Sequence, residues 1–291
     1  MHEFSILDTK IGNKYPPYII AELSGNHNGD LNIAKELIEK SKEIGVDAVK
    51  FQKRTIKTVY SEESLNTYRE SPWGSTQREQ KLGLEFNEND YDQIDKFCKE
   101  IGIIWYASAW DVESQIFLQK YNHPINKIAS AMATNLDFVD FVAQEKKPTF
   151  ASTGMCTLSQ IDKLVKIFAN NDCPLVLLHT NSEYPSPESN LNLSFIKSLQ
   201  SMYNLNIGYS GHEVSVSPSL ISVVLGAVAV ERHITLDRSM YGSDQSASLE
   251  PRGFKSLVDM IRKFNSVYGD GKKKITDNEI EIAKKLRYWE Q

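Results

Sequence analysis

The chain has 291 residues and a mass of 33.0 kDa, with 41% hydrophobic and 24% charged residues. This composition is typical of a folded globular protein and excludes a disordered or fibrous one. The net charge of −5 and the pI of about 5.8 provide no basic field for nucleic acid or for an anionic membrane, so an anionic ligand must be held by a local group of side chains.

Neither a membrane span nor a secretion signal is predicted. No apolar run approaches the roughly 18 residues that a span requires, and the start MHEFSILDTK lacks the apolar core of a signal peptide. We therefore expect a cytoplasmic protein. The three cysteines, Cys98, Cys156 and Cys173, follow no disulfide or metal-binding pattern and are expected to be buried free thiols.

Short apolar runs alternate along the chain with amphipathic helical stretches such as NIAKELIEKSKEIG and LSQIDKLVKIFAN. The predicted strands are Tyr18–Ala21, Ala48–Phe51, Ile103–Ala107, Lys127–Ala129, Pro148–Ala151, Leu175–His179, Asn206–Gly208 and Val228–Arg232. Eight strand–helix units predict an α/β fold, a single-domain (β/α)8 TIM barrel, rather than an open doubly wound sheet. The GxGxxG fingerprint of a dinucleotide site after the first strand is also missing.

We expect one barrel domain over residues 1–291. Residues 53–85 form a long polar loop after the second strand, which is more typical of a lid than of a disordered segment. Residues 270–291 form a short helical extension whose KKK run is typical of a solvated helix start.

Polar residues follow almost every predicted strand, at the end where the active site of a barrel is built. They are Glu22, Lys50, Gln52, Lys127, Ser130, Ser152, His179, Ser182, Tyr184, Ser210, His212, Glu231, His233 and Asp244. Each one alone has an ordinary structural explanation, such as a helix cap, but all eight loops face one cavity. Two lysines in such a cavity are tolerable if an anion binds between them, which indicates an anionic substrate.

His212 and His233 follow neighbouring strands, so their side chains can converge. Two imidazoles with open positions suit a divalent metal such as Mn, Fe, Co or Zn that acts as a Lewis acid. A histidine at a strand end is also commonly only hydrogen-bonded, so spacing alone leaves both interpretations open.

Read together, several segments resemble the sialic acid synthase family, the phosphoenolpyruvate-dependent N-acetylneuraminate synthases and their relatives that make legionaminic and pseudaminic acids. The matching segments are AELSGNHNGDLNIAKELIEKSKEIGVDAVKFQ, KIAS, STGM, LLHTNSEYP, GYSGHE and GAVAVERHITLDRSMYGSD. The resemblance implies a transferase of the carbon–carbon bond-forming type. It would condense phosphoenolpyruvate with an open-chain aldose, N-acetylmannosamine or a related hexose, giving a nonulosonic (sialic-acid-like) 2-keto-3-deoxy sugar acid and phosphate.

The resemblance also implies roles for individual residues. Phosphoenolpyruvate would be held by Lys50, Lys127, Ser130, Ser152, Ser182 and Ser210. The aldose or a metal-bound water would contact Glu22, Gln52, Tyr184 and Asp244, with Glu22 or Asp244 as the base that activates water. His212 and His233 would hold a divalent metal, Mn²⁺ or else Mg²⁺ or Co²⁺, that polarises the aldehyde. A homodimer is expected as well.

The sequence departs from the family in three places. Relatives usually read SDHT and EKHF where this chain has Ser210–Glu213 and Glu231–Ile234, and the wall at Ala107–Asp111 replaces a serine-threonine-proline run. The family typically adds a C-terminal antifreeze-like domain whose arginine contacts the sugar's acyl group, and residues 270–291 are too few to form it. The substrate would then lack that group, or another residue, such as Arg69, Arg78 or Arg252, would replace the arginine.

Three other functions fit parts of the pattern. A Schiff-base sugar-acid aldolase would use Lys127 as its amine and need no metal. A 3-deoxy-ulosonate phosphate synthase would act on a phosphorylated aldose and require a second phosphate site. A sugar-binding or regulatory protein could keep the barrel without catalysis, but the retained lysines and histidines argue against it.

Overall fold

Eight parallel strands close into a barrel in the computed structural model, which describes residues 3–290. Each strand pairs with the next one along the chain, and the last pairs with the first. The strands are β3 (Tyr18–Glu22), β4 (Ala48–Lys53), β7 (Ile104–Ala109), β8 (Asn126–Ile128), β9 (Thr149–Ser152), β10 (Leu175–Thr180), β11 (Asn206–Gly211) and β12 (Ala229–His233). The prediction of a (β/α)8 TIM barrel is therefore confirmed.

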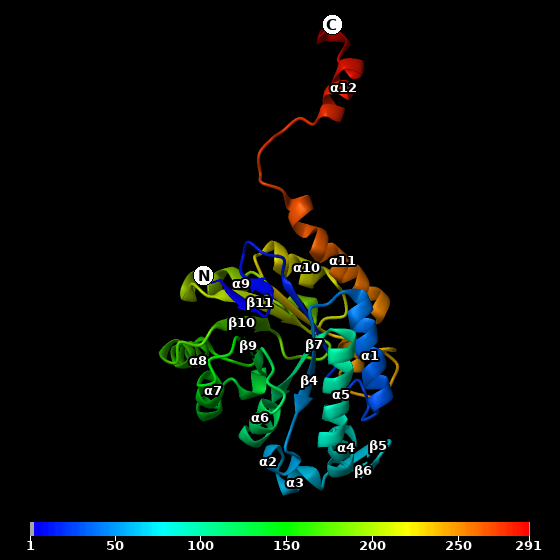
Figure 1. The fold of residues 1–291 in the computed structure, drawn as a ribbon, viewed down its shortest axis with the longest axis vertical. Coiled ribbons are helices and arrows are strands. Elements are labelled where there is room, and N and C mark those ends of the chain that lie inside the picture. The colour runs from blue at the N-terminus through cyan, green and yellow to red at the C-terminus, as the bar shows by residue number, and fades with distance from the viewer. Residues whose placement is uncertain (1–2, 291) are drawn as a thin grey trace.

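Helices surround the barrel on the outside (Figure 1). They are α1 (Leu31–Ile44), α5 (Glu88–Ile101), α6 (Val112–Gln119), α7 (Leu136–Ala143), α8 (Leu158–Asn170), α9 (Phe195–Tyr203), α10 (Ser217–Val224) and α11 (Pro251–Tyr268). Their ends follow local sequence signals. A reciprocal capping box between Thr157 and Gln160 starts α8, and Gly45 ends α1 at a φ of 92° that a residue with a Cβ rarely adopts.

Several strands continue beyond their predicted ends. β10 includes Thr180, and β11 runs on to Gly211, three residues past the predicted end at Gly208. The sequence interpretation stopped where the apolar run stopped. The barrel ladder continues through the polar residues because their backbone groups still pair with neighbouring strands, as Thr180 does with Ser210.

The predicted long loop after β4 contains regular structure. It holds α2 (Ile56–Val59), α3 (Glu62–Leu65), β5 (Tyr68–Ser71), β6 (Gly74–Thr76) and α4 (Gln77–Leu84), and we call residues 56–84 the insert. Gly29 permits close packing here, since a Cβ on it would lie 1.9 Å from the carbonyl oxygen of Gly83. Trp73 of the insert packs edge-to-face on Tyr241, with ring centroids 5.8 Å apart. The insert is thus anchored to the loops that follow β3 and β12.

A short N-terminal hairpin, which the sequence interpretation missed, lies at the other end of the barrel. It pairs β1 (Phe4–Ile6) with β2 (Thr9–Ile11). Ile6 and Ile11 are buried in the same apolar cluster as side chains from the barrel strands, among them Tyr106 and Phe150. The hairpin therefore closes the barrel at the amino ends of its strands.

The C-terminal helix α12 (Asp277–Leu286) extends away from the barrel (Figure 1). The helical extension expected there thus takes the form of a single short helix and a final turn, η4 (Tyr288–Glu290). Within residues 3–290, no helix is long and apolar enough to cross a membrane.

Removing one apolar side chain of the hairpin should destabilise the barrel. We expect Ile6→Ala to lower the free energy of unfolding by about 2–5 kcal/mol, because the 1%-exposed side chain would leave a cavity. Ser5→Ala, on the exposed face of the same strand, should change it by less than about 0.5 kcal/mol. Urea denaturation measures both, and equal effects of the two substitutions would refute the closing role of the hairpin.

Candidate active site

A cavity of about 160 Å³ opens at the carboxyl ends of the barrel strands. All the predicted site residues except Asp244 line it. They come from seven of the strands or the loops that follow them: Glu22, Lys50, Gln52, Lys127, Ser130, Ser152, Ser182, Tyr184, Ser210, His212 and His233. The structure thus brings together residues that lie far apart in the sequence.

The two-residue period of a strand explains this convergence. Alternate side chains of a barrel strand face its interior, so residues separated by one position share the cavity. Three strands or their ends contribute such pairs: Lys50 with Gln52, Ser210 with His212, and Glu231 with His233.

Two lysines and two glutamates form a buried layer in the floor of the cavity, which we call the charge layer (Glu22, Lys50, Lys127, Glu231). Lys50 forms an ion pair with Glu22, and its Nζ lies 3.6 Å from Glu231 Oε1. Lys127 Nζ lies 3.8 Å from the same oxygen. None of the four side chains is more than 5% exposed. Such burial is tolerable only because opposite charges are paired.

Serine hydroxyls complete the hydrogen bonding of the charge layer. Lys50 donates to Ser108 at 3.0 Å, Lys127 donates to Ser152 at 2.6 Å, and Ser210 donates to Glu231 at 3.3 Å. A hydroxyl can donate as well as accept, so each of these serines can turn to an oxyanion that enters the cavity.

The two lysines differ in how firmly they hold a proton. Burial disfavours the charge on Lys50, but Glu22 and Glu231 outweigh it and raise the Lys50 pKa above its usual value. Burial lowers the pKa of Lys127 to about 8, because Glu231 compensates only in part and Lys50 repels it. Near neutral pH, Lys127 is therefore the member of the layer that gains most from a second negative charge.

A glycine brings two more hydroxyls to the rim of the cavity. The N–H of Gly154 donates to Ser130 Oγ at 3.0 Å. A Cβ on Gly154 would lie 2.2 Å from Ser182 Oγ and 2.9 Å from Ser130 Oγ, so only glycine allows both serines to approach. Ser130 and Ser182 thus stand side by side at one wall.

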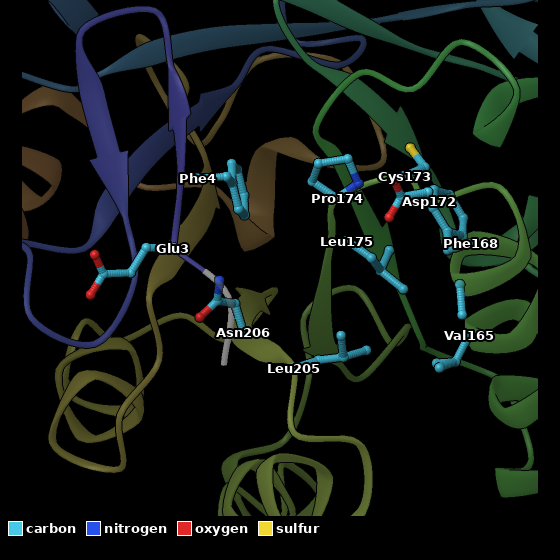
Figure 2. A pocket seen from close by; sticks show the side chains of 11 residues that line it. Glu3, Phe4, Val165, Phe168, Asp172, Cys173, Pro174, Leu175, Leu205 and Asn206 are labelled. Atoms are coloured by element: carbon cyan, nitrogen blue, oxygen red, sulfur yellow. The ribbon is translucent and has the colours of Figure 1, made fainter.

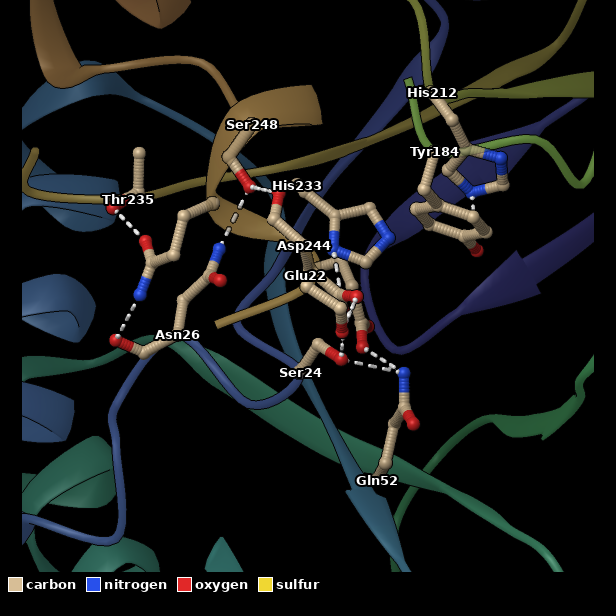
Figure 3. Close-up of polar contacts among 12 residues, drawn as sticks. Glu22, Ser24, Asn26, Gln52, Tyr184, His212, His233, Thr235, Asp244 and Ser248 are labelled. Atoms are coloured by element: carbon tan, nitrogen blue, oxygen red, sulfur yellow. Dashed lines mark hydrogen bonds and ion pairs between the residues drawn. The ribbon is translucent and has the colours of Figure 1, made fainter. Parts of the chain in front are cut away.

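His212 and His233 lie close together, with ring centroids 5.3 Å apart (Figure 3). His212 Nδ1 lies 2.6 Å from the carbonyl oxygen of Asn181, to which it can only donate, so its Nε2 carries the lone pair. Nε2 accepts from the Tyr184 hydroxyl at 2.9 Å. Burial, and next the neighbouring His233, lowers the pKa of His212 to about 3, so the ring is neutral.

These residues fit a divalent metal ion. Ligating histidines usually donate their second N–H to a carbonyl or carboxylate, as His212 does to Asn181. The Nδ1 of His233 is buried without a hydrogen-bond partner and lies 3.8 Å from Asp244 Oδ2. Across residues 3–289, no group of three or more His, Cys, Asp or Glu side chains is arranged to hold a metal. The protein would supply the two imidazoles, and water or substrate the other ligands.

Asp244 lies behind the cavity lining in a hydrogen-bonded chain (Figure 3). Ser24 donates to Asp244 Oδ2 at 2.6 Å, and Gln52 Nε2 donates both to Ser24 at 2.8 Å and to Glu22 Oε1 at 3.0 Å. The two carboxylates considered as the base are therefore joined through Gln52, but Glu22 alone of the two lines the cavity.

Comparison with known proteins assigns the chain to a family. The NeuB family profile matches residues 37–273. The chain belongs to the NeuB family. It is 36% identical to the N-acetylneuraminate-9-phosphate synthase of Mus musculus over 95% of this chain and 78% of that protein. Identity to the N,N'-diacetyllegionaminic acid synthase of Legionella pneumophila is also 36%, over 95% and 80% of the two chains.

A solved structure extends the likeness to three dimensions. An N-acetylneuraminic acid synthetase from Leptospira borgpetersenii, crystallised with citrate, matches with a TM-score of 0.85 and 30% identity over 99% of this chain and 98% of that one. The predicted family and the prediction of an enzyme are confirmed.

Sequence reasoning about this NeuB-family enzyme named three further residues of the cavity lining but assigned them no role in the site. Glu231 contacts both lysines, Ser108 contacts Lys50, and Trp110 forms part of the wall. The strand period predicts that Glu231 belongs to the site, because it stands two positions before His233 and therefore faces the same side of the strand. In the segment Ala107–Asp111, where the sequence departs from the family, Asp111 has a structural role. It caps α6 by accepting from the N–H of Ser114 at 2.7 Å.

None of the three arginines proposed to replace the family's sugar-contacting arginine lines the cavity. Arg78 forms an ion pair with Glu62 within the insert, and Arg252 is exposed on α11. Arg69 lies on β5 and has no such carboxylate partner among residues 3–289.

A larger cavity of about 390 Å³ lies at the amino ends of the strands (Figure 2). Its walls are largely apolar and include Phe4, Val165, Phe168 and Leu175. None of the predicted site residues lines it, so volume alone does not locate the chemistry of this NeuB-family protein.

The two segments that carry the histidines also depart from the family sequence, and one residue of each segment, Glu213 and Arg232, contacts the other. Arg232 is fully buried and donates to Glu213 Oε1 at 2.8 Å and to Ser219 Oγ at 2.9 Å. Glu213 follows His212 in the chain, and Arg232 precedes His233. This ion pair therefore ties together the two segments that present the imidazoles.

Removing only one charge of the Glu213–Arg232 pair should destabilise the folded protein. We expect Glu213→Gln to lower the free energy of unfolding by about 3–5 kcal/mol, because the Arg232 charge would stay buried without its partner. The double substitution Glu213→Met with Arg232→Met should lose markedly less, since it leaves no buried charge. Urea denaturation of Glu213→Met, Arg232→Met and the double variant provides the cycle. A double variant as unstable as the sum of the single variants would show that the pair is not coupled.

Proposed function

We propose that this enzyme condenses phosphoenolpyruvate with an open-chain aldose to give a nonulosonic, sialic-acid-like 2-keto-3-deoxy acid and inorganic phosphate. C3 of phosphoenolpyruvate would form the new bond to the aldehyde carbon. Water would add to C2, and the resulting intermediate would expel phosphate by cleavage of the carbon–oxygen bond. The observation that carries the proposal is the charge layer with its serines, directly beside the imidazoles of His212 and His233.

The charge layer supports the phosphoenolpyruvate end of this reaction. A trianionic molecule needs cations and hydrogen-bond donors, and Lys50 and Lys127 stand in the floor with Ser152 and Ser210 beside them. Ser130 and Ser182 offer further hydroxyls at the rim. We propose that Lys127 carries the largest share, since no carboxylate of the described residues lies closer to its Nζ than 3.8 Å.

The histidine pair supports the aldehyde end. We propose that His212 and His233 hold a divalent ion, Mn²⁺ with Mg²⁺ or Co²⁺ as alternatives. Lewis-acid polarisation of the aldehyde oxygen is the chemistry that such an ion supplies. Tyr184 stacks on His212 at a centroid distance of 4.0 Å and keeps that ring in place, with its own hydroxyl on the cavity side.

Geometry favours Glu22 over Asp244 as the base for water. Glu22 lines the cavity, and its carboxylate touches Lys50 and Gln52, which orient it. Asp244 lies behind the lining and already accepts from Ser24. We propose that Gln52 binds a hydroxyl group of the sugar, and that Asp244 helps to position Gln52 through Ser24.

One observation supports a rival function. A lysine with a pKa near 8, such as Lys127, holds more of the neutral amine that Schiff-base formation requires. A Schiff-base sugar-acid aldolase would use this amine with pyruvate and without a metal.

The homodimer expected from the family belongs to the proposal as well. Apolar side chains on the C-terminal helix and turn are largely exposed in the single chain, including Leu286 at 70% and Trp289 at 67%. A partner surface would cover them. Light scattering in solution should give twice the 33.0 kDa chain mass, and a single-chain mass would contradict a dimer.

The reaction itself can be tested by product analysis. With Mn²⁺, phosphoenolpyruvate and N-acetylmannosamine or its 6-phosphate, phosphate and sugar acid should form in equal amounts. A heavy-oxygen label in the bridging oxygen should appear in the phosphate. EDTA should abolish turnover and Mn²⁺ should restore it. Lys127→Met should lower kcat/KM by about a hundredfold or more, through loss of a charged hydrogen bond.

Opposite outcomes would favour the rival. Irreversible labelling of Lys127 by borohydride in the presence of pyruvate, together with full activity in EDTA, would contradict the proposed condensation and establish an aldolase.

A further inference from the structure

Arg54 lies beside the reaction cavity but is not among the residues that line it. It follows directly after β4, and its guanidinium lies over the Trp110 ring, 4.1 Å from the ring centre. Trp110 itself lines the cavity. The backbone N–H of Arg54 donates to Glu85 Oε1 at 3.2 Å. Both the backbone and the side chain of Arg54 are therefore fixed next to the site.

The side chain of Arg54 binds an amide rather than a carboxylate. Its guanidinium donates to the side-chain oxygen of Gln52. The nearby carboxylate of Glu85 forms an ion pair with Lys53, and within residues 3–289 no ion pair joins Arg54 to an acid. Because a charged donor gives a stronger hydrogen bond than a neutral one, this contact holds the Gln52 amide firmly.

Gln52 has nearly all of its hydrogen-bonding capacity in use. Its Nε2 donates to Glu22 Oε1 at 3.0 Å and to Ser24 Oγ at 2.8 Å (Figure 3). The Ser24 hydroxyl donates in turn to Asp244, so it accepts from Gln52. An amide has two N–H donors and two lone pairs on its oxygen. Both donors are therefore used and Arg54 occupies one lone pair, which leaves the other without a partner among the described residues.

The remaining lone pair of Gln52 suits one kind of ligand group. Gln52 lines the cavity, and a hydroxyl group of a bound sugar is a donor that this lone pair can accept. The oxygen and nitrogen of an amide are similar in size, so hydrogen bonds decide which of them faces each neighbour. Without the donor from Arg54, the Gln52 oxygen would lose the contact that fixes its direction.

We propose that Arg54 is a positioning residue for the aldose, which acts through Gln52 by directing the free Oε1 lone pair towards a hydroxyl group of the sugar. This inference rests on the proposed condensation, in which Gln52 binds that hydroxyl group. Arg54 touches neither substrate in this arrangement. Its loss therefore weakens binding of the aldose and leaves phosphoenolpyruvate, which has its own partners at Lys50 and Lys127, unaffected.

Steady-state kinetics of Arg54→Met separates this role from a general structural one. With Mn²⁺ and N-acetylmannosamine or its 6-phosphate, KM for the sugar should rise about tenfold, the effect expected when a charged hydrogen bond is lost. KM for phosphoenolpyruvate should keep its wild-type value. Lys57 is exposed on α2, and Lys57→Met is the matched control that should change neither KM. An equal rise of both KM values in Arg54→Met would overturn the proposal.

A double-mutant cycle shows whether Arg54 acts through Gln52. Gln52→Met alone should raise KM for the sugar at least as much as Arg54→Met does. The double variant should be no worse than Gln52→Met, because Arg54 then has no amide to direct. Additive losses in the double variant would mean that Arg54 affects the aldose by another route, and the proposal would be wrong.

The Gln52 amide can also be followed without turnover. In protein labelled with nitrogen-15 glutamine, the side-chain N–H signals that disappear in Gln52→Met belong to Gln52. They should shift in Arg54→Met and keep their positions in Lys57→Met. Unchanged Gln52 signals in Arg54→Met would overturn the positioning role. Should Arg54→Met fail to fold, the neutral variant Arg54→Gln takes its place in each measurement.

The same signals distinguish this proposal from the condensation. A wild type that turns over neither sugar would contradict the condensation. Titration of the labelled protein with N-acetylmannosamine and with its 6-phosphate then decides the role of Arg54. A shift of the Gln52 signals in wild type that needs about tenfold more sugar in Arg54→Met supports the proposal. No shift, or the same titration in both proteins, overturns it.

Discussion

The paired charges in the floor of the barrel constrain everything around them. Glu22, Lys50, Lys127 and Glu231 are buried together, and a buried charge is tolerated only with a partner. The layer contains as many acids as lysines, yet the contacts are unequal, because Lys50 holds Glu22 closely while Lys127 has only the longer contact to Glu231. This asymmetry leaves one cation available to an incoming anion without leaving it unpaired in the free protein.

The rest of the molecule holds this floor and its surroundings in place. The hairpin of β1 and β2 closes the barrel below it, and Glu213 and Arg232 connect the segments of His212 and His233 from behind. The insert lies at the opposite end of the barrel from the hairpin (Figure 1). A paired floor and a connected histidine pair give separate contacts for two substrates, and orienting two reactants in this way favours formation of a bond between them.

Much of this arrangement follows from the sequence. Alternating apolar runs and helices predict the barrel, and the two-residue period then places Lys50, Gln52, His212 and His233 in one cavity. The hairpin could not be predicted, because three-residue strands carry too little pattern. The ion pair of Glu213 with Arg232 could be seen in the sequence only as two separate departures from the family, since nothing in one sequence shows that two residues nineteen positions apart contact each other. The position of Asp244 behind the lining depends on loop geometry, which composition does not determine.

Proton uptake on phosphoenolpyruvate binding tests the central role of Lys127 most directly. Above pH 8 much of Lys127 in the free protein is neutral, and a bound trianion would recharge it. Calorimetry of the metal-free protein in buffers of different ionisation enthalpy should show uptake approaching one proton in wild type and none in Lys127→Met. Binding without proton uptake in wild type, or the same uptake in the variant, would contradict the account.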